Sequence, residues 1–276
     1  MSAHQILLTG EKETLFATLY GRALDARSPH PVLRDRLADE IAMRIEREFG
    51  YDFAKLGIKA DEAVSVAIRA KYVDQETKAA LARASGARVL HLGCGLDTRA
   101  WRVDPDARVE WYDVDYPEVI EVCQALFPSR QRHLLIGSSV TDEGWLNELP
   151  ADRPVVVVAE GLVQYLAKED FVRMVRAIVA RFPAGVILFD AWNSFSAKVG
   201  QNQRCIQVTG AKLGGWGIDD PRELEPLVPG LHFDAAFDFL TVPEVRRFSW
   251  HARLGIRVMR VVRSFRDAAR ILRYRF

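Results

Sequence analysis

Two glycines and an aspartate carry the clearest chemical signal in the sequence. Gly93 and Gly95 follow an apolar run that ends at Leu92, and Asp115 ends a second apolar run about 20 residues later. The first pattern predicts a buried strand that enters a tight turn, where missing Cβ atoms let a ligand approach the backbone. The second predicts a neighbouring strand whose terminal carboxylate reaches a ribose hydroxyl. Together they predict a nucleoside-containing cofactor at the carboxyl edge of a parallel sheet.

The loop after the glycines indicates which nucleoside this is. A dinucleotide-binding loop has a third glycine after two further residues, and this sequence has Thr98 there. No phosphate-binding GxxxxGK[ST] segment is present in the loop either. Two glycines without a phosphate grip, followed by an acid on the next strand, suit S-adenosylmethionine better than NAD. For the glycine pair alone, an ordinary strand-to-helix turn is the alternative interpretation.

Longer segments around these residues resemble the leucine carboxyl methyltransferase family, and within it the bacterial polyketide-type (tetracenomycin-like) carboxyl O-methyltransferases. The resemblance is carried by VLHLGCGLDTRAW, YDVDYPEVI and VVVVAEGLVQYL, and extends to ETLFATLYGRALDA, IRAKYVD and WGIDDPRELEPL. It covers nearly the whole chain. It implies an S-adenosylmethionine-dependent O-methyltransferase on a Rossmann-like class I methyltransferase sheet, mostly parallel with the last strand antiparallel, with a helical lid.

The resemblance assigns cofactor contacts to individual residues. Gly93 and Gly95 would line the methionine part of the cofactor. The family's ribose-binding acid lies in an acidic pair before a proline, matched here by Asp113 and Asp115 ahead of Pro117. We assign the role to Asp115 and expect Asp113 to face the other way along the strand, as a solvated acid at the strand end.

Three further side chains are expected near the reacting groups. Arg69 matches the family arginine that pairs with the cofactor's carboxylate, and a guanidinium suits this task. A surface position on an exposed helix is its alternative, and Lys71 is a competitor. Glu160 follows VVVVA at the end of a strand, and its family counterpart lies against the sulfonium end and amino group of the cofactor. Tyr165 matches a family tyrosine near the acceptor, with a plain core aromatic as the alternative. We assign Glu160 and Tyr165 to the catalytic centre.

The segment after the third predicted strand departs from the family pattern. The family commonly has an Asp-Leu pair there that holds the adenine, whereas this chain has Ser139 and Val140. A serine hydroxyl can still bond the exocyclic amine, but without charge. We therefore expect an adenine contact at Ser139 and Val140.

The chemistry of methyl transfer points to the acceptor. Transfer from a sulfonium is an in-line displacement, so positioning and exclusion of water supply most of the catalysis. A carboxylate is already ionised at pH 7 and needs no base, whereas a phenol would need one. None of the six histidines lies in a motif that marks a base. This favours a small-molecule or polyketide-like acid as the substrate. Alternatives are a phenol or hydroxyl acceptor, a nicotinamide dehydrogenase, and a non-enzymatic cofactor-binding scaffold.

Composition limits the remaining possibilities. The 276 residues suffice for one α/β domain, and 49% of them are hydrophobic. The net charge of +1 gives no field to attract nucleic acid, and no apolar run is long enough to span a membrane. Three widely spaced cysteines without a CxxC pair argue against disulfides and a metal site. Without a recognisable signal peptide, the chain is expected in the cytoplasm. The sequence leaves the oligomeric state open.

The element pattern, together with the resemblance, predicts one domain with four parts. A helical cap over 1–85 precedes a cofactor-binding core over 86–192, a lid over 193–230, and late strands with a basic helix over 231–276. Alternating strands and helices in the core predict a parallel sheet covered on both faces. Helices are expected at 14–25, 33–49, 61–84, 116–127, 142–149 and 168–181, and strands at 88–92, 108–113, 133–137, 154–159 and 185–190. The late strands are LHFDAAFDFL and ILRYRF, and the resemblance implies that ILRYRF is antiparallel.

The last 31 residues are rich in arginine. Ten arginines lie between Arg246 and Arg275, against the single acid Asp267. From Arg257 to Arg273 they recur every three or four residues with apolar residues between them, which predicts a basic amphipathic helix. A solvated face is the favoured interpretation, with membrane or nucleic-acid binding and an anion-binding role as alternatives.

Overall fold

A seven-stranded sheet forms the centre of the molecule. The computed structural model describes residues 10–202 and 204–276. The strand order is β3-β2-β1-β4-β5-β7-β6, with β1 to β5 mutually parallel and β7 antiparallel to both β5 and β6. The expected class I methyltransferase sheet is therefore confirmed, and ILRYRF lies in its antiparallel strand. The strands are β1 (Arg88–Leu92), β2 (Trp111–Asp115), β3 (His133–Gly137), β4 (Val155–Ala159), β5 (Gly185–Trp192), β6 (His232–Asp238) and β7 (Ala269–Arg275).

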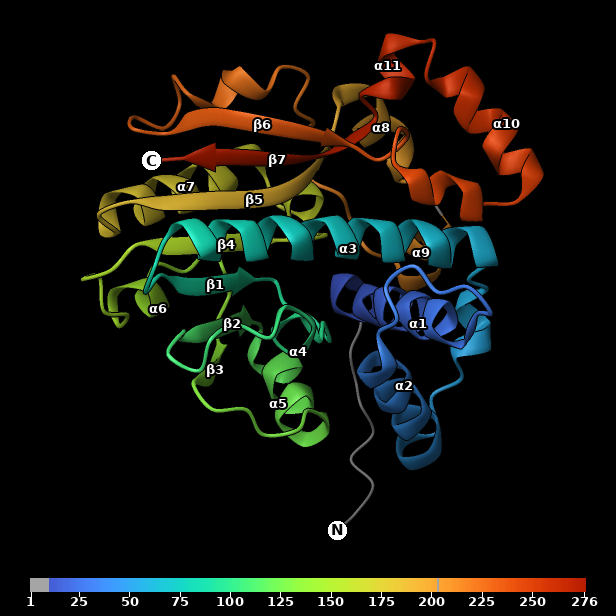
Figure 1. Cartoon of the computed structure of the whole chain (residues 1–276), viewed down its shortest axis with the longest axis horizontal. Helices are drawn as coiled ribbons and strands as arrows, with labels where there is room; N and C mark the ends of the chain where they lie inside the picture. The colour runs from blue at the N-terminus through green and yellow to red at the C-terminus, as the bar shows by residue number, and fades with distance from the viewer. Residues whose placement is uncertain (1–9, 203) are drawn as a thin grey trace.

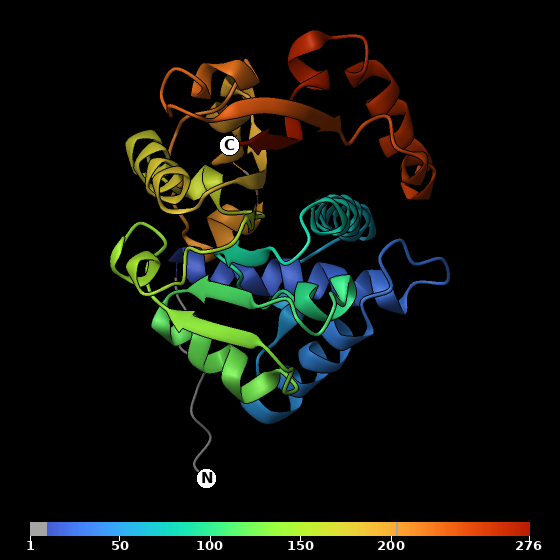
Figure 2. The same cartoon turned by 60° about the vertical axis from the view of Figure 1, so that its left-hand side comes forward.

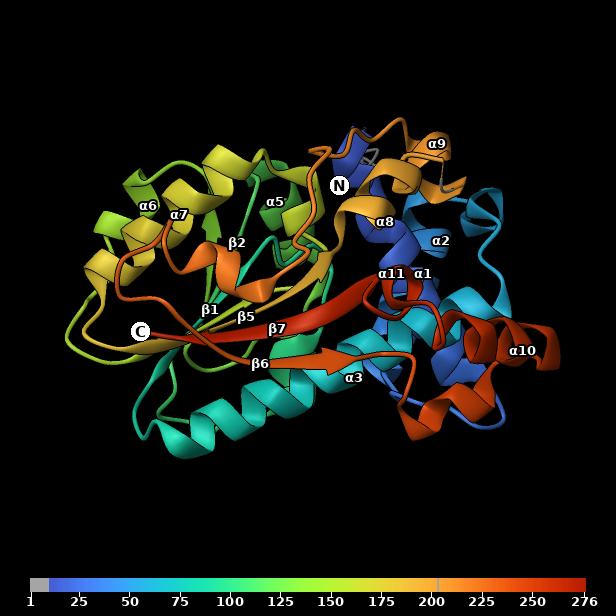
Figure 3. The same cartoon turned by 90° about the horizontal axis from the view of Figure 1, so that it is seen from above.

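Helices cover both faces of this sheet, as Figure 3 shows from above. Successive side chains of a strand point to opposite faces, so an apolar run such as VVVVA supplies both. Val155 and Val157 pack with α7 (Lys168–Arg181), whereas Val156 and Val158 pack with α3 (Ala60–Arg83). The central strands are consequently buried on both sides. The other core helices are α4 (Arg99–Val103), α5 (Pro117–Leu126) and α6 (Gly144–Asn147).

The amino-terminal helices lie beyond the ends of the parallel strands (Figures 1 and 3). They are α1 (Thr14–Arg27) and α2 (Arg36–Phe49), which contact each other, and α1 also packs along α3. Helix α2 begins three residues later than predicted because Asp35 caps it, accepting a hydrogen bond from the Ala38 N–H. Their apolar faces form a core of their own around Phe16, Ile41 and Ile45.

Two boundaries in the core differ from the sequence prediction. The second strand covers 111–115 instead of 108–113, because the N–H groups of Arg108 and Val109 both bond to Asp106 in a turn. Its later residues pair with both neighbouring strands, and Asp115 aligns with Gly137. The helix expected at 142–149 is reduced to the single turn of α6.

The basic helix predicted between Arg257 and Arg273 is wrong in its second half. Helix α10 (Trp250–Met259) and the short α11 (Arg263–Arg266) are helical, but the chain then enters β7. Ile271, Leu272 and Tyr274 are completely buried in this strand. Burial on both faces of a sheet outweighs the helical spacing, because the intervening Arg273 finds acidic partners in Glu76 and Asp234.

The first part of the segment between β5 and β6 contains α8 (Ser194–Gly200) and α9 (Arg204–Thr209), and α9 contacts α1. The 3-10 turn Pro221–Leu224 that follows lies instead against β6 and the core around α7. Figure 2, turned by 60°, shows the late strands and α10 stacked on the opposite side of β1 from β3. In the described ranges, no helix combines the length and apolar character needed to cross a bilayer.

Candidate active site

A cavity of about 810 Å³ opens at the carboxyl edge of the parallel strands. It lies where the chain order reverses, with β2 on one side of β1 and β4 on the other, which is the usual ligand position in open α/β sheets. The loops after β1, β2, β3 and β4 and the last residues of β5 line its floor, and residues of α1 and α3 line its walls. All the sequence-predicted site residues line it: Arg69, Gly93, Gly95, Asp115, Ser139, Val140, Glu160 and Tyr165.

The glycine turn needs its glycines. Gly93 and Gly95 adopt φ values of 61° and 52°, which side chains disfavour. A Cβ atom on Gly93 would lie 2.9 Å from a methyl group of Leu162. The Gly95 N–H donates to Asp115 Oδ2 at 2.7 Å, and the Tyr116 N–H donates to Oδ1 at 2.7 Å. Each oxygen of Asp115 thus accepts one amide and keeps a second lone pair for a ligand hydroxyl.

Asp113 faces away from the cavity into a buried polar cluster. Its carboxylate bonds to His91 Nδ1 at 2.9 Å, Trp111 Nε1 at 2.8 Å and His133 Nε2 at 2.7 Å. Although burial opposes ionisation, these bonds hold the pKa of Asp113 at about 2. Arg99 can only donate to His91 Nε2, so the ring proton of His91 lies on Nδ1 and is donated to Asp113. The expectation of a solvated acid at the strand end was wrong, since Asp113 is 1% exposed.

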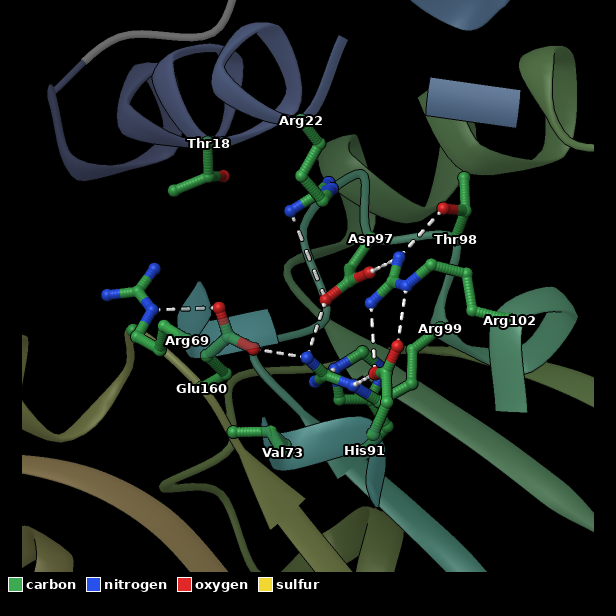
Figure 4. Close-up of polar contacts among 12 residues, drawn as sticks. Thr18, Arg22, Arg69, Val73, His91, Asp97, Thr98, Arg99, Arg102 and Glu160 are labelled. Carbon is green, nitrogen blue, oxygen red and sulfur yellow. Dashed lines mark hydrogen bonds and ion pairs between the residues drawn. The ribbon is translucent and has the colours of Figure 1, made fainter. Parts of the chain in front are cut away.

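Glu160 lies between two arginines at the end of β4 (Figure 4). Arg69 Nε donates to Oε1 at 2.8 Å, and Arg99 Nη2 donates to Oε2. Burial would raise the pKa of Glu160, but Arg99 and Arg69 outweigh it and hold the pKa below its usual value. Lys71, the competitor of Arg69, instead pairs with Glu244 at 2.6 Å on the outer side of α3.

Sequence reasoning missed the charged groups that hold these residues. Asp97 follows the glycine turn and pairs with Arg99 at 3.1 Å and Arg102 at 2.6 Å, which holds its pKa well below normal despite burial. Arg22 and Thr18 project from α1 over this network (Figure 4). The charged residues Asp97 and Arg99 close behind the glycines were the available sequence signal. Nothing in the neighbouring sequence indicates which side chains they contact in the fold.

Asp190 is a second missed residue. It ends the apolar run of β5 just as Glu160 ends that of β4, so the same signal was present in the sequence. It lines the cavity and accepts hydrogen bonds from Arg69 and from the Gly161 N–H.

Other groups in the cavity show what chemistry it can host. Cys94 is buried, and burial raises the pKa of its thiol well above the usual value, which argues against a thiolate nucleophile. Among residues 10–202 and 204–276, no three histidine, cysteine or acidic side chains are grouped to hold a metal ion. Tyr165 ends the 3-10 turn Val163–Tyr165 directly after the Glu160 loop and faces the same space.

Comparison with known proteins identifies the family of the chain. The model of the family described as leucine carboxyl methyltransferase matches residues 16–179. Over 274 residues, the chain is 42% identical to the tetracenomycin polyketide synthesis O-methyltransferase TcmP of Streptomyces glaucescens, covering 98% of each chain. The chain belongs to the leucine carboxyl methyltransferase family. It is an S-adenosylmethionine-dependent methyltransferase, as the sequence analysis expected.

A second relative agrees with the methyltransferase activity, and a solved structure agrees with the fold. The chain is 34% identical to the S-adenosyl-L-methionine-dependent methyltransferase dpfgK of Gibberella zeae, over 92% of this chain and 91% of that protein. A putative methyltransferase from Thermobifida fusca has the same fold, with a TM-score of 0.57, 16% identity, and 92% and 93% of the two chains covered. The nicotinamide dehydrogenase alternative is therefore set aside.

Proposed function

We propose that this methyltransferase family member esterifies a carboxylate of a small, polyketide-like acid. The observation that carries the proposal is the make-up of the cavity wall. Among the described residues that line it there is no histidine, whereas Lys212 supplies positive charge; Lys12 also lines it but is paired with Glu118. A carboxylate acceptor is attracted by such charge and needs no base at neutral pH.

The donor half of the cavity fits S-adenosylmethionine. Arg69 would hold its carboxylate and Glu160 its ammonium group, since each presents the opposite charge within the cavity. Asp115 has acceptor capacity for the ribose hydroxyls, and Ser139 and Val140, which also line the cavity, would contact the adenine. When bound, the donor supplies an electrophilic methyl group on a sulfonium.

The acceptor half supports catalysis by positioning. Leu166, Trp192 and Ile206 give it apolar walls that exclude water, and Tyr165 lies close to the Glu160 loop. The protein's work is then to hold the acceptor oxygen in line with the sulfonium methyl group. The 42% sequence identity to a polyketide synthesis O-methyltransferase supports a polyketide-like acceptor.

A product assay distinguishes the carboxylate from a hydroxyl acceptor. The full chain is incubated with methyl-labelled donor and a panel of aromatic acids, matched phenols and their methyl-blocked derivatives. A labelled product that releases methanol in mild alkali, formed from acids only, is the expected result. An alkali-stable aryl ether formed from the phenols would refute the carboxylate proposal and favour hydroxyl methylation.

A further inference from the structure

We propose that Asp190 is a positioning residue that aims Arg69 at the carboxylate of the methyl donor. The proposal rests on the proposed function, in which Arg69 binds that carboxylate. It assigns a task to a buried acid that the chemistry of methyl transfer does not itself require.

The two oxygens of Asp190 hold two different parts of the site. Oδ1 accepts the N–H of Gly161 at 2.6 Å, and Oδ2 accepts Arg69 Nη1 at 3.2 Å. The Asp190 side chain is only 3% accessible, so both bonds are sheltered from water. One carboxylate near the end of β5 therefore ties the loop after β4 to a side chain of α3, 121 residues away from Asp190.

Arg69 is fixed from two directions but keeps one side accessible. Its Nε is bonded to Glu160 and its Nη1 to Asp190, two acids that are 4% and 3% accessible. The arginine itself is 20% accessible and lines the cavity. A guanidinium fixed by two buried partners before the ligand arrives loses less conformational freedom on binding.

Gly161 keeps space open beside the third nitrogen of Arg69. Its φ is +70°, and a Cβ there would lie 3.5 Å from Arg69 Nη2. Asp190 thus holds Gly161 in place through its N–H, and Gly161 leaves room beside the guanidinium.

The charge arrangement explains why Glu160 alone is insufficient. Glu160 is shared between Arg69 and Arg99, so Arg69 has only one of its oxygens. Without the charge of Asp190, the guanidinium could turn and take Glu160 with two nitrogens, since bidentate pairing is the stronger geometry. That rotation would withdraw both the arginine and the glutamate from a donor amino acid.

The test compares two ligands that differ in one carboxylate. Calorimetry measures the Kd of S-adenosylhomocysteine and of its decarboxylated analogue for the wild-type chain and for Asp190→Asn. The asparagine oxygen can still accept the Gly161 N–H, but its charge is lost. We expect Asp190→Asn to weaken S-adenosylhomocysteine binding about tenfold and to change binding of the decarboxylated analogue less than twofold.

A matched control separates positioning from general structural damage. Asp113→Asn removes an equally buried carboxylate from β2 that does not contact Arg69. It should lower stability and leave the preference between the two ligands unchanged. If Asp190→Asn does not fold, Asp190→Glu keeps the charge but displaces it, and a reduced preference is again expected.

Each outcome has one meaning. Equal weakening of both ligands in the Asp190 variant, or no weakening of either, overturns the positioning role. Failure of the wild-type chain to bind either ligand would instead refute the proposed donor site. A preference for the carboxylate that is present in the wild type and abolished by Asp190→Asn supports both.

Discussion

Two acids on β2, Asp113 and Asp115, should have different effects when each is replaced. Asp115 lines the cavity and Asp113 lies in the buried cluster beneath it. Replacing each by alanine should therefore separate ligand affinity from folding stability, because alternate residues of a strand face opposite sides.

Asp115→Ala should mainly weaken binding of the methyl donor. Two charge-assisted hydrogen bonds to ribose hydroxyls disappear, which corresponds to about 1–3 kcal/mol of binding free energy. The amides of Gly95 and Tyr116 border the cavity, where water can replace the carboxylate. The free energy of unfolding should fall by only about 1 kcal/mol.

Asp113→Ala should mainly lower the free energy of unfolding. A native pKa of about 2 against an unfolded value near 3.9 corresponds to roughly 2–3 kcal/mol at pH 7. Three buried donors also lose their acceptor, so a total near 3–5 kcal/mol is expected. Because the folded pKa is lowered, the pH-dependent part is complete above about pH 4 and disappears as the pH falls through 2.

Calorimetry with S-adenosylhomocysteine and urea unfolding at several pH values measure the two quantities. The difference in unfolding free energy between wild type and Asp113→Ala should shrink below pH 4, while Asp115→Ala shows no comparable trend. The reasoning fails if Asp113→Ala weakens the ligand more than Asp115→Ala does, or if its destabilisation does not depend on pH in this range.

Three other results are expected. S-adenosylmethionine and S-adenosylhomocysteine should raise the melting temperature through linkage whereas NAD and NADP should not, and a shift with the nicotinamides alone would contradict the donor assignment. Gly93→Ala should weaken S-adenosylhomocysteine binding at least about tenfold, because the new Cβ meets Leu162 at 2.9 Å and φ is 61°. Gly86→Ala is its control: φ is +78° but nothing lies within 4 Å of the new Cβ, so only stability should fall. At saturating donor, the methylation rate of an acid acceptor should stay nearly flat from about pH 6 to 8.5, since a carboxyl group titrates near 4. A rate that rises through about pH 6.5 would indicate a histidine base.

The sequence by itself determined the features that depend on neighbours along the chain. The turn at Gly93 and Gly95 and the acid at position 115 could be predicted because strand ends, tight turns and side-chain alternation are local properties. The run VVVVA predicted a central strand for the same reason, and with it the edge where Glu160 lies. Alternation of strands and helices then predicted the parallel sheet.

Only the tertiary structure decided which charged groups meet. Arg69 is 91 residues from Glu160 and 121 from Asp190, and no spacing rule links α3 to the ends of β4 and β5. The same holds for the arginines at the carboxyl end. Their helical spacing was overruled in β7, where burial between β5 and β6 and long-range ion pairs to Arg273 stabilise a strand. Local sequence patterns specify the helices and strands, whereas the contacts between side chains depend on the order of the strands in the sheet.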